Sequence, residues 1–71
     1  MASEVCAEMV ANVVQVVVGP SDEVAAGDTL LVLESMKMEI PVLAETGGTV
    51  AEIKVHEGDV VQEGDVLVVL A

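Results

Sequence analysis

The sequence predicts one small all-β domain, and three observations support this. Valine supplies 17 of the 71 residues, against 2 isoleucines and 6 leucines, and branched side chains of this kind pack well on the pleated surface of a sheet. Apolar residues do not persist at helical spacing, whereas glycine and proline recur along the chain as turn signals. The chain also repeats itself. Because 71 residues leave no room for a second domain, we expect a single fold built from that repeat.

The repeat has an offset of 37 residues and aligns Gly27 with Gly64. Of the 22 positions from Asn12 to Leu33, 9 are identical in the second copy. An internal repeat indicates a repeated structural unit before it indicates any function. Two copies are too few for a solenoid, but they can form interlocked half-sheets related by a pseudo-twofold axis, each covering the apolar face of the other.

Both copies predict the same elements in the same order, with half-repeats over about 9–34 and about 46–71. A long strand comes first, followed by a turn with aspartate, a short valine-containing stretch, a Gly-Asp turn and a last strand. Aspartate suits these turns because its short side chain bonds nearby backbone amides. In the second copy the elements are 50–55, Gly58-Asp59, 60–61, Gly64-Asp65 and 66–70.

The segment between the two copies, 34–41, gives conflicting signals. Symmetry predicts that it connects the two halves of the fold. Turn chemistry alone predicts one continuous strand from Thr29 to Ala44, because two methionines flank Lys37 and no residue there favours a positive φ. A local rule that fails inside a consistent pattern often marks a functional or strained site.

Charge and composition exclude several kinds of partner. With 13 acidic residues and only two lysines, the formal net charge is -11, which repels phosphate backbones and anionic membranes and favours a monomer. No aromatic residue is present that could stack on bases. The acidic residues are interleaved with hydrophobic ones, which indicates a solvated surface rather than a dedicated acidic recognition patch.

The cysteine content and the N-terminus predict a cytoplasmic protein. Cys6 is the single cysteine, so an internal disulfide and a cysteine metal cluster are excluded. The first eight residues carry two glutamates and no basic region, and the longest apolar run is the six residues Val66 to Ala71. Neither feature is typical of an export signal or a membrane span.

The central segment Glu34 to Met38, with Glu39 and Ile40 after it and Gly-Asp turns on both sides, resembles the biotinyl domain of biotin carboxyl carrier proteins, in the biotinyl/lipoyl attachment family. The resemblance runs from about Met9 to Leu70, and it implies a single biotinyl domain over residues 1–71. The implied fold is a flattened barrel-sandwich of two antiparallel four-stranded sheets with quasi-twofold symmetry. An attachment hairpin at 35–39 would present the lysine at its exposed tip.

Carried over by position, the resemblance implies that Lys37 is the attachment residue for biotin. Its ε-amine would form an amide with the valeryl carboxyl of biotin in a reaction run by a separate biotin protein ligase. Lysine amines are almost fully protonated near neutral pH and are poor nucleophiles alone, which fits a dependence on that ligase. Recognition by the ligase would involve the neighbouring residues Met36, Met38, Ser35 and Glu34.

Two positions depart from the usual pattern of the family. Ser35 stands where alanine is common, and the first turn reads Gly19-Pro20-Ser21-Asp22 where Gly-Asp is more frequent. Relatives often form the end of a larger subunit, whereas this chain reaches its first strand almost at once. We therefore expect a free-standing carrier.

The function implied is that of a carrier and not of an enzyme. Biotin on Lys37 would accept carboxylate from a biotin carboxylase and deliver it to a carboxyltransferase. Two alternatives stay open, namely a lipoyl carrier of an oxo-acid dehydrogenase or glycine cleavage system, and an unmodified β interaction module. Methionine on both sides of Lys37 disfavours lipoate, because the lipoyl branch usually carries Asp-Lys-Ala at these positions.

Other candidate residues have simpler interpretations. Met36 and Met38 could partly pack under the turn, since methionine often fills gaps. His56 lies at a turn position without a catalytic partner nearby, and Lys54 fits a solvated strand face. The acidic residues at 57, 59, 63 and 65 belong to two turns and lack the spacing of a calcium loop.

Overall fold

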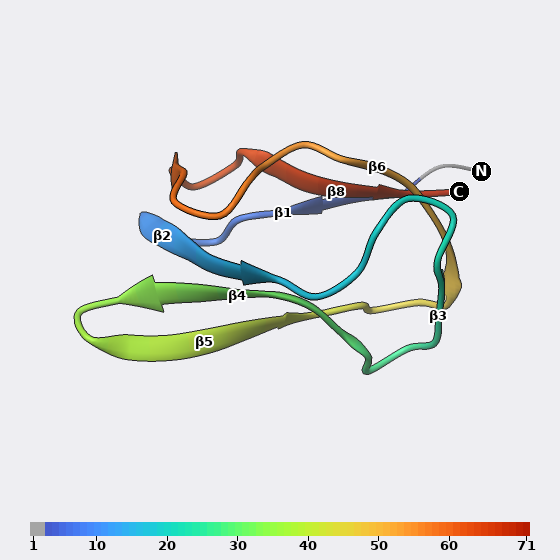
Figure 1. Cartoon of the computed structure of the whole chain (residues 1–71), viewed down its shortest axis with the longest axis horizontal. Helices are drawn as coiled ribbons and strands as arrows, with labels where there is room; N and C mark the ends of the chain where they lie inside the picture. The colour runs from blue at the N-terminus through green and yellow to red at the C-terminus, as the bar shows by residue number, and fades with distance from the viewer. Residues whose placement is uncertain (1–2) are drawn as a thin grey trace.

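Eight strands arranged in two antiparallel sheets make up the regular structure of residues 3–71, the part of the chain that the computed structural model describes (Figure 1). One sheet has the strand order β1-β8-β6-β3 and the other β5-β4-β2-β7. The all-β prediction and the two four-stranded sheets implied by the resemblance are confirmed. The strands are β1 (Ser3–Cys6), β2 (Ala11–Val16), β3 (Glu23–Val24), β4 (Thr29–Ser35), β5 (Met38–Leu43), β6 (Gly48–Ile53), β7 (Val60–Val61) and β8 (Val66–Leu70).

The 37-residue offset relates the two sheets strand by strand and pair by pair. It maps β1 on β5, β2 on β6, β3 on β7 and β4 on β8, which converts the strand order of one sheet into that of the other. The register follows, because the pair Ser3↔Leu70 becomes Ile40↔Leu33, and the bulges recur at equivalent places. The structural correspondence thus extends beyond the half-repeats of the sequence to β1 and β5. Each sheet draws two strands from each copy, so neither copy can form a complete four-stranded sheet alone.

The core lies between the two sheets and is built from small aliphatic side chains. Leu30, Leu31 and Leu33 of the first copy are buried, and so are Leu67, Val68 and Leu70 at the equivalent positions of the second. Among residues 3–71, no polar or charged residue is buried. Burial of these faces against each other therefore holds the two copies together, in addition to the strand pairing between them. The remaining buried residues are Ala7, Ala11, Val13, Val24, Ala44, Val50, Val55 and Val61.

Four aspartate turns with one geometry connect the strands at the ends of the sheets. In each, the aspartate carboxylate accepts a hydrogen bond from the backbone N–H three residues earlier, over 2.8 to 2.9 Å. The aspartate N–H donates back to the carbonyl of that same residue. The residue before the aspartate has a positive φ, which glycine adopts without steric strain. These residues are Gly27 (φ 92°), Gly58 (95°), Gly64 (94°) and Ser21 (76°).

The departure at Gly19-Pro20-Ser21-Asp22 therefore leaves the turn unchanged. Asp22 Oδ2 accepts the Gly19 N–H at 2.8 Å, the same distance at which Asp59 accepts the His56 N–H. Ser21 adopts the left-handed conformation that Gly58 has in the other copy.

The continuous strand predicted from Thr29 to Ala44 by turn chemistry is wrong. The chain reverses between β4 and β5, whose strands pair antiparallel down to Ser35↔Met38. A 16-residue strand would be about 50 Å long at roughly 3.3 Å per residue, but the longest axis of the molecule is 33 Å. The β4–β5 turn lies at one end of the long axis, and the end of β8 lies at the other (Figure 1). Residues 3–71 contain no helix long and apolar enough to cross a membrane.

Candidate functional site at the Lys37 hairpin

The loop between β4 and β5 contains two residues, Met36 and Lys37, both with positive φ. The values are 53° and 64°, the combination that defines a type I′ hairpin turn. Such turns match the twist of their strands, but they usually contain asparagine or glycine. For other L-residues the left-handed conformation is unfavourable by about 1–2 kcal/mol each. Backbone strain of this kind persists where the surroundings enforce it, often at functional sites.

The side chains of the turn point into solvent. Met36 is 90% exposed and Met38 is 61% exposed, so neither is a core residue, and the alternative that they pack under the turn is disfavoured. Lys37 is exposed as well, while Ser35 and Glu34 behind it are half-buried. The structure brings all five predicted site residues together at the end of one hairpin.

The two lysines differ in their surroundings. Lys54 Nζ lies 3.1 Å from a carboxylate oxygen of Glu52, which supports its interpretation as a residue of a solvated surface. Lys37 has no carboxylate within 4.0 Å of its amine in the described part of the chain. An exposed amine at the turn of a paired hairpin, without an ion-pair partner in this part of the chain, fits the covalent attachment of an acyl group.

Directly behind the turn, two carboxylates lie opposite each other. Glu34 and Glu39 form a cross-strand pair between β4 and β5, and like charges in this arrangement are destabilising. Like the left-handed turn, this pair is a local feature that lowers stability close to Lys37.

The structure also accounts for the other candidate residues. His56 is exposed, and its Nδ1 lies 3.8 Å from Asp59 Oδ2 within an aspartate turn. The acidic residues 57, 59, 63 and 65 lie in and around two such turns, and over residues 3–71 no group of three or more histidine, cysteine or acidic side chains could hold a metal ion. Cys6 is a free, exposed thiol. None of these residues builds a second site.

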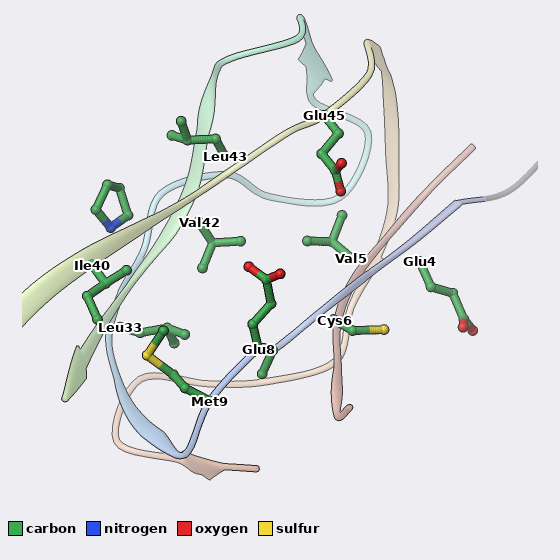
Figure 2. Close-up of a pocket in the computed structure, with 12 residues that line it drawn as sticks. Glu4, Val5, Cys6, Glu8, Met9, Leu33, Ile40, Val42, Leu43 and Glu45 are labelled. Carbon is green, nitrogen blue, oxygen red and sulfur yellow. The ribbon is translucent and has the colours of Figure 1, made fainter. Parts of the chain in front are cut away.

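Sequence reasoning missed one surface feature, a groove of about 510 Å³ between β1 and β5 (Figure 2). These are the outer strands of the two sheets, so the groove lies where the barrel is open. Val5 and Val42 line it together with Glu8 and Glu45, and each of these two pairs is related by the 37-residue offset. Lys37 is not among the lining residues. The 37-residue repeat, which relates β1 to β5, was the signal from which the proximity of these two strands could have been predicted.

The fold and the site together define a small β domain whose rigid body presents one lysine at the end of its long axis. Comparison with known proteins identifies the family. Residues 1–70 match the biotin/lipoyl family model, described as biotin-requiring enzyme, so the chain belongs to this family.

Two relatives and one solved structure illustrate the similarity. The chain is 52% identical over 71 residues to the biotinylated protein TB7.3 homolog of Mycobacterium leprae, covering 100% of both chains. It is 47% identical over 64 residues to the biotin/lipoyl attachment protein of Bacillus subtilis, covering 90% of this chain and 88% of that protein. The structure of Kluyveromyces lactis urea carboxylase matches with a TM-score of 0.94 and 32% identity, over 100% of this chain but only 6% of the carboxylase.

Proposed function

We propose that this chain is a biotin carboxyl carrier in which Lys37 holds the biotin. The observation that carries the proposal is the placement of Lys37 at the tip of a strained hairpin, exposed and without an ion-pair partner among residues 3–71. Family membership supports biotin as the cofactor. Attachment by a biotin protein ligase would join Lys37 Nζ to the valeryl carboxyl of biotin as an amide.

In this role the protein body positions the cofactor and leaves the chemistry to its partners. When bound, biotin supplies the ureido nitrogen that takes up carboxylate in a biotin carboxylase and releases it in a carboxyltransferase. The body keeps the tip of the hairpin in one conformation, because the Lys37 turn continues directly into two paired strands. Covalent tethering raises the effective concentration of the cofactor at each partner site without tight binding of the domain.

Biotin is favoured over lipoate by the residues beside the lysine. Methionine occupies both positions, Met36 and Met38, where a lipoyl domain usually has aspartate and alanine. Both methionines are exposed, so a modifying enzyme can contact their side chains directly. The relative that covers the whole chain is itself described as biotinylated.

Intact mass followed by peptide mapping tests the proposal. The full chain is coexpressed once with a biotin protein ligase and once with a lipoate ligase, each with its free cofactor. We expect a gain of one biotinyl group, located on Lys37, and no lipoyl group. Lys54 serves as the internal control, because it is the other lysine of the chain and forms an ion pair on the strand surface. An unmodified chain, a lipoyl group, or biotin on Lys54 would contradict the proposal.

A further inference from the structure

Three exposed valines lie on the outer face of the sheet that carries the Lys37 hairpin. Val10 is 63% exposed, Val14 40% and Val60 66%; we call these three residues the valine face. Val10 directly precedes β2, and Val14 is the residue left unpaired by the bulge between Val13 and Gln15; both are exposed. Within β2, Asn12 lies on the side opposite the buried Val13. Val60 pairs with Asn12 across β2 and β7 and therefore shares that face.

The pseudo-twofold symmetry provides an internal control for this patch. On the other sheet, the offset of 37 residues places Gly47, Ala51 and Glu23 at the equivalents of Val10, Val14 and Val60. All three are exposed as well, and the strand pairing around them is the same. The fold therefore does not require apolar side chains at these positions. Gly47 has a packing reason, because an added Cβ would lie 3.2 Å from the carbonyl oxygen of Val24, so the comparison rests on Ala51 and Glu23. At their equivalents, Val14 and Val60 on the sheet with Lys37, the apolar side chains point to a functional reason.

The valine face and the two glutamates behind the turn belong to one continuous surface. The strand pairing links Val60, Asn12, Glu34 and Glu39 in a single row across the four strands β7, β2, β4 and β5. Neighbouring strands are about 4.8 Å apart, so the row spans roughly 15 Å, and it lies one residue pair behind Ser35↔Met38 at the turn. A protein interface of standard size covers about 800 Å² on each partner. One such interface therefore covers this row together with the Lys37 turn.

We propose that the valine face, together with Glu34 and Glu39, is the docking surface for the biotin protein ligase that modifies Lys37. The inference rests on the proposed function. The matching ligase surface would offer apolar side chains to the valines and a basic side chain to the two carboxylates, which form no ion pair within 4.0 Å in the described part of the chain. Exposed apolar patches next to charge are typical of such binding sites.

The ligase fits this surface better than other occupants. To acylate the short side chain of Lys37, the ligase must approach the protein body closely, whereas the longer biotinylated arm lets later partners act from a greater distance. A second copy of the chain is disfavoured because each copy has a net charge of -11, and both would bring the same pair of glutamates into the contact.

Single-turnover kinetics separate docking from chemistry. A purified ligase preloaded with activated biotin is mixed with increasing concentrations of the full chain. The test variant combines Val10→Thr, Val14→Thr and Val60→Thr, because threonine keeps the branched shape and strand preference of valine but is polar. We expect the half-saturating concentration to rise about tenfold, with the maximal rate within about twofold of the wild type. Val17→Thr is the matched control, because Val17 is 50% exposed but lies beyond β2, towards the end of the sheet away from Lys37.

The charged part of the surface is tested with a second pair of variants. Glu39→Gln removes one of the two paired carboxylates, and Glu23→Gln makes the same change in net charge on the other sheet. We expect Glu39→Gln to raise the half-saturating concentration about threefold at low salt and less at high salt, because salt screens exposed charges. Glu23→Gln should have no such effect.

The outcomes distinguish this inference from the proposed function. If wild-type chain takes up no biotin on Lys37, the proposed function fails. If the wild type is labelled and the folded triple threonine variant docks equally well, the docking surface is wrong while the carrier function stands. If the variant is labelled at the wild-type rate but transfers carboxylate more slowly, the face serves a carboxylase partner and the assignment to the ligase is overturned. Unchanged circular dichroism and thermal midpoint show that the variant is folded.

Discussion

The four aspartate turns and the Lys37 turn use the same left-handed backbone in different ways. In three of the aspartate turns glycine supplies the positive φ, and all four are closed by an aspartate carboxylate that accepts a backbone N–H. In the Lys37 turn, Met36 and Lys37 are both left-handed, and within residues 3–71 no side chain forms a hydrogen bond to it.

This difference indicates that the residues of the aspartate turns stabilise the fold, whereas those of the Lys37 turn expose the lysine side chain. The aspartate turns follow the local rules of turn chemistry and are repeated by the symmetry. The Lys37 turn breaks those rules and is not repeated by the symmetry, because at the equivalent end of the other sheet β1 begins and β8 ends (Figure 1). Among residues 3–71, apart from Ser21, the left-handed residues outside this turn are glycines, so two adjacent non-glycine residues give up stability only at the turn that contains Lys37.

The largest expected effect comes from Lys37→Arg. Arginine keeps the positive charge but lacks the amine that forms the amide, so biotin addition should be abolished. The thermal midpoint should stay within about 2 °C of the wild type, because the side chain is exposed and surface substitutions change stability little. Intact mass after coexpression with the ligase measures the first effect and a thermal melt the second. Lys54→Arg is the control and should be labelled like the wild type; biotin on the Lys37→Arg chain would refute the attachment site.

Gly64→Ala should break an aspartate turn without touching the site. An added Cβ would meet nothing within 4 Å, so the effect arises from the backbone alone, where φ is 94°. The left-handed conformation is less favourable for alanine than for glycine, and we expect a loss of about 1–2 kcal/mol. For a domain of this size that lowers the thermal midpoint by roughly 4–16 °C.

The matched control for Gly64→Ala is Gly19→Ala. Gly19 does not have a positive φ, and an added Cβ would lie 3.9 Å from Asp22 Oδ2, an ordinary contact. This variant should stay within about 0.5 kcal/mol of the wild type. Equal losses in both variants would show that the positive φ is not what the glycine provides.

Met36→Gly should change stability and function in opposite directions. Glycine relieves the strain of the left-handed conformation, and little packing is lost because Met36 is 90% exposed. The free energy of unfolding should therefore rise by about 1 kcal/mol. Ligation should become slower, because the ligase loses a side chain beside Lys37 and the turn becomes less ordered. Urea denaturation and the rate of biotin addition measure the two effects. A variant that is more stable and labelled at the wild-type rate would show that Met36 has no role in presentation.

Much of this architecture could be predicted from the sequence because the residues of the turns repeat with the symmetry of the fold. The Gly-Asp pairs at 27, 58 and 64 mark turns by local chemistry, and the offset between the copies then relates the strands. The reversal at Met36 and Lys37 could not be predicted in this way. It is imposed by the pairing of β4 with β5 and by the length of the molecule, whereas the local residues favour continuation.

The first strand of each copy was also hidden from sequence comparison. Between β1 and its equivalent in β5, only Val5 and Val42 are identical. Both strands lie at the edges of their sheets, where one side of the backbone has no neighbouring strand and the choice of residues is freer. Lys37 as the candidate attachment residue, at the exposed tip of a hairpin, could be inferred from resemblance to a known motif, while the positive φ of Met36 and Lys37 required the structure.

The smallest expected effect tests whether Ser21 is a residual strain in an otherwise regular set of turns. Ser21 has a φ of 76°, in the left-handed region where its counterpart Gly58 has a φ of 95° without strain, and Ser21 is exposed. Ser21→Gly should therefore stabilise the fold by about 0.5–1 kcal/mol. The urea midpoint should rise with an unchanged slope, and biotin addition should be unaffected, because the turn lies outside the Lys37 hairpin. Comparison with Met36→Gly then isolates function, since both variants relieve a left-handed residue but only one lies beside the lysine. If Ser21→Gly also slowed ligation, the slower ligation of Met36→Gly could not be assigned to the site.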